Sequence, residues 1–309
     1  MFASLRALLT ELIDYAGLFP PSKLPLDQAI RNYARYRQED DAWMLGRFII
    51  PASRLEDLEP YHDELFRVNP PFAFSVLGRG GGTLTEFLGN LREDLRDIAA
   101  FRKRHGQCVT VDVLEIRLPL DLIDPSLPES DLSLSKTLRV FPMVDLFPFC
   151  ESPDRPEELV KQLSRLPGDN VGFKLRCGGL EASAFPSSER VATVLHGCLR
   201  ATLAFKATAG LHHPLPRFDP EVKARMHGFI NVFLAGALAY SCNLSIEQIR
   251  GLLDDDQANH FSFTNKQASW RKHRTTTAEI AAARRDFMRS FGSCSFEEPC
   301  EDLRRLGWL

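Results

Sequence analysis

The sequence has little net charge and no segment that resembles a secretion signal. Its 309 residues carry 38 Lys and Arg against 41 Asp and Glu, which gives a formal net charge of −3. Because no overall positive field would attract nucleic acid or an anionic membrane, a small molecule is the expected partner. Residues 1–17 include Arg6, Glu11 and Asp14 where a signal peptide needs an unbroken apolar run. We therefore expect a helix of a mature, cytoplasmic protein.

Paired cysteine motifs are also missing. The seven cysteines are an odd number, spread along the chain without a CxxC spacing: Cys108, Cys150, Cys177, Cys198, Cys242, Cys294 and Cys300. This pattern favours free thiols in a reducing compartment over a disulfide framework or a zinc ribbon. Only Cys177 lies where a reactive thiol could act, and no activating residue is recognisable beside it. The other cysteines are interpreted as small apolar residues.

A long uncharged segment is present, but it is interrupted by polar residues. No Asp, Glu, Lys or Arg occurs in 228–246, which contains Asn231, Ser241, Asn243 and Ser245. Its apolar centre is shorter than the roughly 20 residues that a membrane span requires. The segment is predicted to be a buried helix, and no membrane partner is expected.

No repeat, low-complexity segment or flexible linker divides the chain. The length fits either two ordinary domains or one (β/α)8 barrel of about 250 residues or more. A composition of 44% hydrophobic and 26% charged residues is that of a folded protein. Short apolar runs alternate with longer runs of helical period, which is typical of parallel βα units.

Eight of these runs are predicted to be strands. They lie near 15–20, 44–51, 72–78, 110–118, 139–146, 171–179, 203–210 and 260–266. Each is followed by a plausible helix, so the pattern favours a single-domain α/β fold, the (β/α)8 or TIM barrel, over two doubly wound domains. An N-terminal helix precedes the barrel, and an insertion after the seventh strand holds two helices.

Polar side chains spaced by two residues mark the ends of three predicted strands. They are Glu115 and Arg117, Lys174 and Arg176, and Lys206 and Thr208. Catalytic groups of such barrels lie at the C-terminal strand ends, where the βα loops converge. A buried ammonium group is costly unless it is paired or has lost its proton, so two lysines on adjacent strands need an explanation.

Two explanations of the lysines stay open. In the structural one, Lys174 and Lys206 pair with Glu115 and Asp145 in an ion network that closes the barrel top. In the functional one, a neighbouring cation and a dry site lower the pKa of one lysine, which then forms a Schiff base with a carbonyl substrate. Glu115 would then move protons as a general acid or base.

Three arginines are candidates for binding the anionic group of a substrate: Arg79, Arg117 and Arg176. Thr208 is a further candidate binding residue. Arg79 belongs to the glycine-rich segment 78–83, which precedes a predicted helix capped by Thr83 and Glu86. Such a helix N-terminus favours an anion, and a flexible turn explains the glycines equally well.

A second group of candidates contains histidine. His212 and His213 directly follow the seventh predicted strand, so both imidazoles are expected near the catalytic mouth. His227 opens the uncharged segment, and Asn231 follows one turn later on the same side. Proton transfer, substrate binding, a metal and ordinary loop hydrogen bonds are the alternatives for this group.

The lysine pattern resembles that of the class I, Schiff-base-forming aldolases with a (β/α)8 barrel, most nearly the deoxyribose-phosphate aldolase type. The matching positions are Glu115, Lys174 in FKLRCGG and Lys206 in FKATAGLHH. The resemblance implies a Schiff base at Lys174, with Lys206 as the cation that perturbs it. The family's Lys-Thr-Ser-Thr-Gly-like run is closer to the sequence at Lys206, so the choice of nucleophile stays open. LHHPLPRF and NKQASW replace the family's phosphate loops, so a sugar phosphate is not implied.

The leading hypothesis is an aldolase-type lyase that acts on a small anionic oxo compound without a metal or another cofactor. Lys174 or Lys206 would be the covalent amine, and His212 or His213 an auxiliary acid or base. The alternatives are a non-covalent isomerase, decarboxylase or metal-assisted lyase that uses the histidines, and a catalytically silent barrel that binds a metabolite or a partner protein. Assembly into a homo-oligomer stays open.

Overall fold

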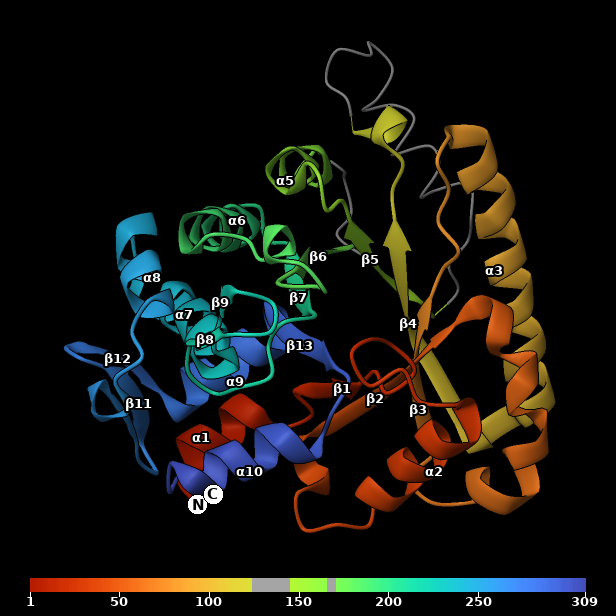
Figure 1. Cartoon of the computed structure of the whole chain (residues 1–309), viewed down its shortest axis with the longest axis horizontal. Coiled ribbons are helices and arrows are strands. Elements are labelled where there is room, and N and C mark those ends of the chain that lie inside the picture. Colours follow the sequence, from red (N-terminus) through yellow and green to blue (C-terminus); the bar gives the residue numbers. More distant parts are fainter. Residues whose placement is uncertain (124–144, 166–170) are drawn as a thin grey trace.

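Eight parallel strands close into a barrel, with helices packed around it (Figure 1). The computed structural model describes residues 1–123, 145–165 and 171–309. Around the barrel the order is β1, β13, β7, β6, β5, β4, β3, β2. The strands are β1 Ile13–Tyr15, β2 Leu45–Pro51, β3 Phe72–Leu77, β4 Val109–Arg117, β5 Phe147–Glu151, β6 Gly172–Arg176, β7 Ala204–Thr208 and β13 Met288–Ser293. The predicted (β/α)8 class is confirmed.

The helices follow the amphipathic pattern of the sequence. In α2 the apolar residues Leu26, Ala29, Ile30 and Tyr33 recur at helical spacing and are buried, so one face of the helix packs on the barrel. The helices of the described part are α1 Ala3–Leu9, α2 Leu26–Tyr36, α3 Leu84–His105, α5 Pro156–Leu163, α6 Ser188–Arg200, α7 Phe229–Cys242, α8 Ile246–Leu253, α9 Thr277–Asp286 and α10 Glu297–Arg305.

The start of α3 confirms the predicted cap, because the Thr83 side chain accepts a hydrogen bond from the Glu86 backbone N–H. The helix predicted after β2 does not form as an α-helix. Residues 52–66 instead make short 3-10 and π turns. Pro60 lies within them and lacks the backbone N–H that a regular helix would need there.

The predicted eighth strand is wrong. Residues 260–266 contain β10 (Phe261–Phe263), which belongs to an antiparallel sheet with β11 (Gln267–Trp270) and β12 (His273–Thr276). The barrel is closed instead by β13, between β7 and β1. The Phe229 and Phe233 rings of α7 lie 5.4 and 5.8 Å from the Phe291 ring. Packing against this helix fixes β13 in the barrel wall.

Two other strands differ from the predicted bounds. β1 ends at Tyr15, so the rest of the predicted strand 15–20 is a loop. Of the predicted fifth strand 139–146, residues 139–144 lie outside the described residues, and β5 covers Phe147–Glu151. Both shifts change which residues point into the barrel, because alternate side chains of a strand face opposite sides.

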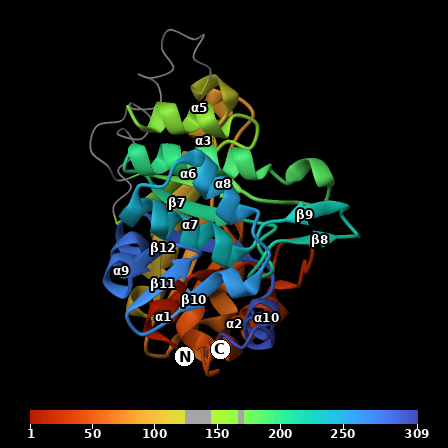
Figure 2. The same cartoon turned by 90° about the vertical axis from the view of Figure 1, so that its left-hand side faces the viewer.

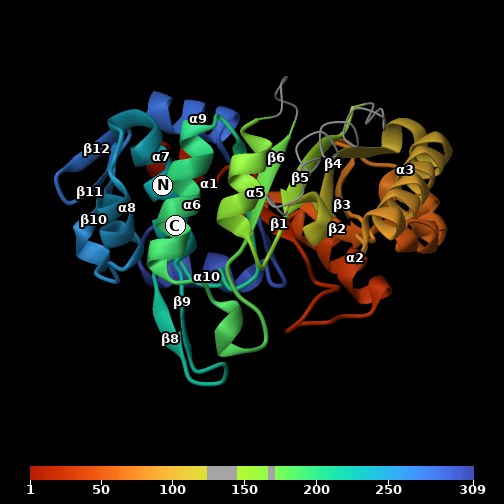
Figure 3. The same cartoon turned by 90° about the horizontal axis from the view of Figure 1, so that it is seen from above.

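The inserted segment after β7 contains the two predicted helices. The first, α7, has every residue from Phe229 to Ala239 buried, as predicted for an uncharged core helix. No helix in the described part of the chain is long and apolar enough to cross a membrane. Before α7, β8 (Arg217–Asp219) and β9 (Ala224–Met226) form a hairpin that extends beyond the barrel (Figures 2 and 3).

The barrel interior is built in layers. Val113, Phe149 and Ala204 form an apolar layer. Gly172 belongs to the same level, and a Cβ atom there would come within 2.5 Å of the Phe149 ring, so this ring occupies the space of the missing side chain. Two residues further along β4, β5, β6 and β7 the interior positions hold Glu115, Glu151, Lys174 and Lys206. Charged residues thus lie on an apolar floor, toward the strand ends where the loops converge.

Candidate active site

The two lysines lie side by side on neighbouring strands. In the parallel pairing of β6 with β7, Lys174 is opposite Lys206. Only 3% of Lys174 and 1% of Lys206 is exposed. Two buried ammonium groups at this spacing require carboxylates. The structure supplies three, from Asp14, Glu115 and Glu151; with the lysines they form what we call the ion cluster.

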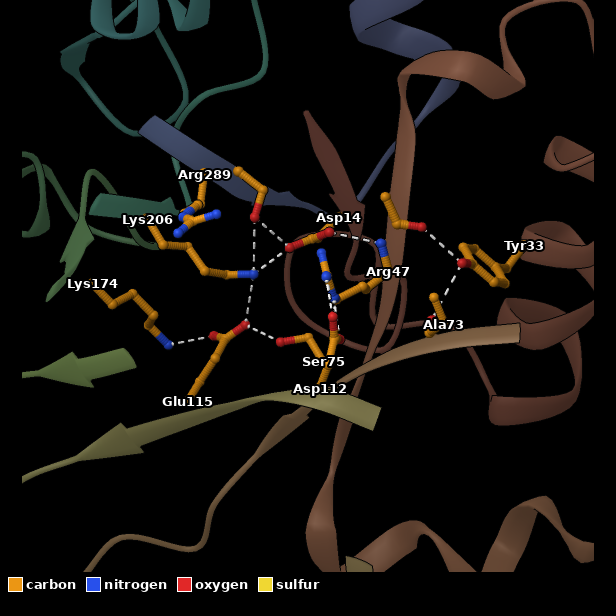
Figure 4. Close-up of polar contacts among 12 residues, drawn as sticks. Asp14, Tyr33, Arg47, Ala73, Ser75, Asp112, Glu115, Lys174, Lys206 and Arg289 are labelled. Carbon is orange, nitrogen blue, oxygen red and sulfur yellow. Dashed lines mark hydrogen bonds and ion pairs between the residues drawn. The ribbon is translucent and has the colours of Figure 1, made fainter. Parts of the chain in front are cut away.

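Glu115 lies between the two lysines (Figure 4). Its Oε2 atom accepts a hydrogen bond from Lys174 Nζ at 2.8 Å, and its Oε1 atom lies 3.0 Å from Lys206 Nζ. The Ser75 hydroxyl also donates to Oε1, at 2.7 Å. Burial alone would raise the pKa of Glu115, but the charges of Lys174 and Lys206 hold it well below its usual value. Glu115 is therefore ionised in the folded protein.

Lys206 is enclosed on its other side by β1 and β13. Its ammonium group donates to Asp14 and, at 3.3 Å, to the Ser290 hydroxyl. Ser290 in turn donates to Asp14 at 2.7 Å, and the Arg47 backbone N–H donates to the other Asp14 oxygen at 2.7 Å. These bonds tie the first strand and the last strand together through Lys206.

Besides Glu115, Lys174 contacts Glu151, the last residue of β5. Its Nζ atom lies 2.6 Å from Glu151 Oε2, and Arg176 Nε donates to Glu151 Oε1 at 3.3 Å. Burial would lower the pKa of Lys174, but the charges of Glu115 and Glu151 raise it above its usual value. The expectation of a lysine pKa lowered by a neighbouring cation is therefore wrong for Lys174, because its carboxylate neighbours outweigh that cation.

Asp145, the second carboxylate expected in the network, is exposed. Asp14 and Glu151 take its place. The first precedes the start of the predicted first strand, and the second lies beyond the end of the predicted fifth. The predicted strand bounds exclude both positions, so neither is expected inside the barrel.

A cavity of about 540 Å³ opens at the C-terminal strand ends and reaches the ion cluster. Glu115 and Lys174 line it, whereas Lys206 is not among its described lining residues. The predicted candidates Arg176, Thr208, His212 and His213 also line it. Its apolar wall includes Phe19, Pro20, Ile49, Leu77, Leu180 and Phe185. The lining combines this apolar wall with charged side chains of both signs, which suits a small polar molecule.

The loop after β7 positions the two histidines. Ala209 and Gly210 have φ angles of 59° and 67°, a left-handed conformation that costs a non-glycine residue about 1 kcal/mol or more. A Cβ atom on Gly210 would lie 2.6 Å from the Cys177 carbonyl oxygen. The sharp turn brings His212 Nδ1 to 3.2 Å from Glu298 Oε2 and His213 Nδ1 to 2.5 Å from Asp302 Oδ2. Both carboxylates belong to α10, which sequence analysis did not connect with the histidines.

Two of the three predicted anion-binding arginines lie elsewhere. Arg79 pairs with Asp94 and with Asp97, at 2.7 Å, on α3. Arg117 ends β4 with 63% of its side chain exposed, 3.9 Å from Asp154. Neither is among the described residues that line the cavity. Arg217 of β8, which was not predicted, lines it together with Arg176.

The anion expected at the glycine-rich segment is supplied by the protein itself. The backbone N–H of Arg79 donates to Asp94 Oδ2 at 2.9 Å, and that of Gly82 donates to Glu86 Oε2 at 2.8 Å. Both carboxylates belong to α3 and satisfy N–H groups before its N-terminus. The segment therefore works as a capped turn.

His227 and Asn231 also lie away from the main cavity. His227 lines a separate cavity of about 280 Å³, and its Nε2 atom is 2.8 Å from the Pro186 carbonyl oxygen. Asn231 is fully buried, and its Nδ2 atom donates to the carbonyl oxygens of Leu252 and Asp255, at 2.6 and 2.8 Å. Asn231 thus holds the end of α8 against α7, which is a structural contact.

Replacing Asn231 with Ala is expected to lower the free energy of unfolding by about 2–3 kcal/mol, because two buried carbonyl groups lose their donor. Urea denaturation measures this loss. Ser241→Ala on the same helix is the matched control, because Ser241 donates to the Ala237 carbonyl one turn earlier at 3.0 Å and otherwise contacts only the neighbouring Cys242 thiol, at 3.6 Å. A change within about 0.5 kcal/mol is expected. An Asn231→Ala protein as stable as the control would contradict the structural role.

Other missed residues lie in the segment after β13. Cys294 and Glu298 line the cavity opposite His212. The predicted eighth strand at 260–266 gives no reason to expect them, because the strand end that precedes Cys294 belongs to β13. Cys177, the cysteine singled out in the sequence, is buried, and burial raises its pKa to about 12. Its thiol is therefore protonated at neutral pH.

No protein family model matches the chain, and no curated protein is detectably similar to it in sequence. The fold therefore provides the classification, as a (β/α)8 barrel with a cavity at the C-terminal ends of its strands. Among the described residues, no group of three or more His, Cys, Asp or Glu side chains is arranged to hold a metal ion.

Proposed function

We propose that the protein is an aldolase-like lyase in which the Lys174 amine forms a Schiff base with a small anionic oxo compound. The position of Lys174 carries this proposal, because its side chain lines the cavity and contacts the carboxylates of Glu115 and Glu151. Lys206 is the weaker candidate, since Asp14 and Ser290 enclose it on the far side of Glu115.

An ammonium group cannot attack a carbonyl, so Lys174 must first lose a proton. Glu115 and Glu151, at 2.8 and 2.6 Å from Nζ, are positioned to accept it. The amine lone pair then forms the C–N bond while the carbonyl π pair moves to oxygen, and a proton on nitrogen transfers to that oxygen. The carboxylic acid returns the first proton as the hydroxyl leaves as water, which regenerates the carboxylate and gives a protonated imine.

The anionic group of the substrate would lie between the cavity arginines. Arg176 and Arg217 both line the cavity, and a guanidinium group binds a carboxylate or phosphate through paired N–H donors. Arg176 already contacts Glu151, so a bound anion would share this cation with the ion cluster. A compound with a carbonyl and a neighbouring anionic group therefore matches the lining.

A second candidate function follows from the raised pKa of Lys174. If Lys174 keeps its proton throughout, the ammonium group would polarise a bound carbonyl without a covalent bond, as in an isomerase or a decarboxylase. His212 and His213 would then supply the proton transfers. A silent barrel has less support, because a cavity next to the ion cluster gives a carbonyl compound access to Lys174.

Treatment with glyoxylate or pyruvate and then borohydride tests the covalent proposal. The protein is expected to gain the mass of one reduced adduct, since borohydride converts the imine to a stable secondary amine. Lys174→Gln is expected to lose this adduct almost completely, because Gln has no nucleophilic amine. Intact-protein mass spectrometry measures the fraction modified.

Lys161→Gln is the matched control, because Lys161 is an exposed lysine on α5 that pairs with Glu158 at 3.3 Å. It is expected to keep the adduct at the wild-type level. Equal labelling of all three proteins would show reaction with surface amines and would overturn the covalent proposal. Tight binding of the oxo acid without any adduct would instead support the non-covalent candidate.

A further inference from the structure

A second reactive group is assembled in the same cavity from three neighbouring segments. Cys294 follows β13 and His212 lies in the loop after β7, and these two strands are paired in the barrel. Glu298 lies in the first turn of α10. His212 Nδ1 is 3.2 Å from Glu298 Oε2, and the imidazole also shares a hydrogen bond with the Cys294 thiol. All three side chains line the cavity.

The contacts of Cys294 favour a thiolate. Burial would raise its pKa, but hydrogen bonds from His212 and Ser22 lower it. Burial would likewise lower the pKa of His212, but its bonds to Cys294 and Glu298 raise it to about 9. The hydrogen bond from His212 lowers the pKa of Glu298. All three shifts have the sign expected where a thiolate, an imidazolium and a carboxylate attract one another.

Other charged and titratable groups surround these three side chains. His213 and Arg217 act on Glu298 and lower its pKa further. Burial raises the pKa of Tyr15 on β1, and the charge of Cys294 raises it further. His213 and Arg217 thus favour the ionised form of the Glu298 carboxylate that contacts His212.

We propose that Cys294 is a nucleophile, oriented by His212 and Glu298, that adds to small electrophilic carbonyl compounds in the barrel cavity. The arrangement of nucleophile, base and orienting carboxylate is the one that covalent catalysis requires. Cys177, at the end of β6, has no such partners, and its thiol only approaches the Leu175 carbonyl at 4.0 Å.

Cys294 and His212 supply the electron pair and the proton that addition to a carbonyl group needs. The thiolate electron pair forms the C–S bond, the carbonyl π pair moves to oxygen, and the His212 imidazolium gives its proton to that oxygen. The product is a neutral thiohemiacetal, and no oxidant or reductant takes part. Reversal of the same steps releases the carbonyl compound and restores the ion pair. This activity does not depend on the Schiff base proposed for Lys174.

Alkylation by iodoacetamide, followed by peptide mass mapping, tests the thiolate in the intact wild-type chain. At a pH of about 6.5 a free thiol such as N-acetylcysteine is mostly protonated. Its alkylation rate falls about tenfold for each unit by which the pH is lowered further. Cys294 is expected to react at least about tenfold faster than this reference there, with a nearly flat rate up to a pH of about 8. A Cys294 rate that rises tenfold per unit, or no alkylation of Cys294, would overturn the proposal.

Two variants separate activation from simple accessibility. His212→Asn is expected to slow Cys294 at a pH of about 6.5 by about tenfold or more, and Glu298→Gln is expected to move the rate profile to higher pH. Cys177→Ser is the matched control and is expected to leave the Cys294 profile unchanged. Unchanged profiles in both the His212 and the Glu298 variants would show that these side chains do not activate the thiol.

Protection by glyoxylate tests the carbonyl chemistry separately from the Schiff base. In the Lys174→Gln protein, which cannot form the proposed imine, glyoxylate is expected to slow alkylation of Cys294 by occupying the thiol reversibly. Protection that disappears in this variant would contradict thiohemiacetal formation while leaving the Lys174 proposal intact. Loss of the borohydride adduct with retained protection of Cys294 would refute the Schiff base alone.

Discussion

Replacing Glu115 with Gln is expected to lower the free energy of unfolding by about 3–5 kcal/mol, because it removes one partner from a buried ion pair. Glu115 contacts both Lys174 and Lys206, and its loss leaves Asp14 and Glu151 as the remaining cluster carboxylates. Gln keeps the shape of the side chain, so the effect measures the charge and its hydrogen bonds. Chemical denaturation at neutral pH gives the value.

Glu157→Gln on α5 is the matched control, because Glu157 forms a largely exposed pair with Arg190 at 2.9 Å. Exposed pairs contribute little to stability, so the unfolding midpoint should hardly move. If Glu115→Gln destabilised the protein no more than this control, the ion cluster would not be a stabilising element of the barrel.

The stability of the Glu115→Gln variant is also expected to depend less on pH in the acid range. The pKa of Glu115 is depressed in the folded protein, so its contribution to stability is complete above the unfolded value of about 4.3 and is lost as the pH falls below it. Wild-type protein should therefore lose more stability than Glu115→Gln between a pH of about 5 and 3. Parallel stability curves in this range would contradict the depressed pKa.

Replacing Glu151 with Gln is expected to make Lys174 reactive at lower pH. Glu151 lies 2.6 Å from Lys174 Nζ and is one of the charges that raise the lysine pKa. Without this charge the free amine forms at lower pH, while Glu115 remains in place to accept the proton. A fall of one pKa unit would increase the trapping rate about tenfold wherever the ammonium form predominates.

The rate of borohydride-trapped adduct formation, measured against pH, gives the midpoint for each protein. Glu157→Gln again serves as the control, since Glu157 is not among the groups that shift the pKa of Lys174. A lower midpoint is expected for Glu151→Gln and an unchanged one for the control. An unchanged or higher midpoint for Glu151→Gln would show that Glu151 does not hold the proton on Lys174.

The fold class was predictable because the barrel strands are mostly short apolar runs with regular helices between them. The eighth strand was not, because β13 contains Arg289, Ser290 and Gly292 and lacks a continuous apolar pattern. Phe261, Ser262 and Phe263 alternate as a strand should, and they do form one. Local alternation predicts a strand but does not say which sheet it joins.

Three members of the ion cluster were predictable for a simple physical reason. Glu115, Lys174 and Lys206 are charged residues inside apolar strands, where packing alone does not require them. Asp14 and Glu151 depend on strand bounds that shifted by a few residues. Arg117 ends β4 and Arg79 follows β3, but their partners, Asp154 and Asp94, are tertiary contacts that spacing along one strand does not encode.

The histidine loop shows the same limit. The position of His212 after β7 predicted that it faces the cavity, and the structure places it there. Its partners Cys294 and Glu298 lie more than eighty residues away in the sequence and meet it only because β13 pairs with β7. His227 and Asn231, chosen for their spacing on one helix, turn toward other elements.

A crystal structure of the protein after glyoxylate and borohydride treatment would show whether Lys174 is the reacting amine of the cavity, as we propose. Continuous electron density is expected from Lys174 Nζ into the cavity, with the carboxylate of the adduct near Arg176 or Arg217. Density on Lys206 instead, or Lys174 still bound by Glu115 and Glu151 with no adduct attached, would contradict this proposal.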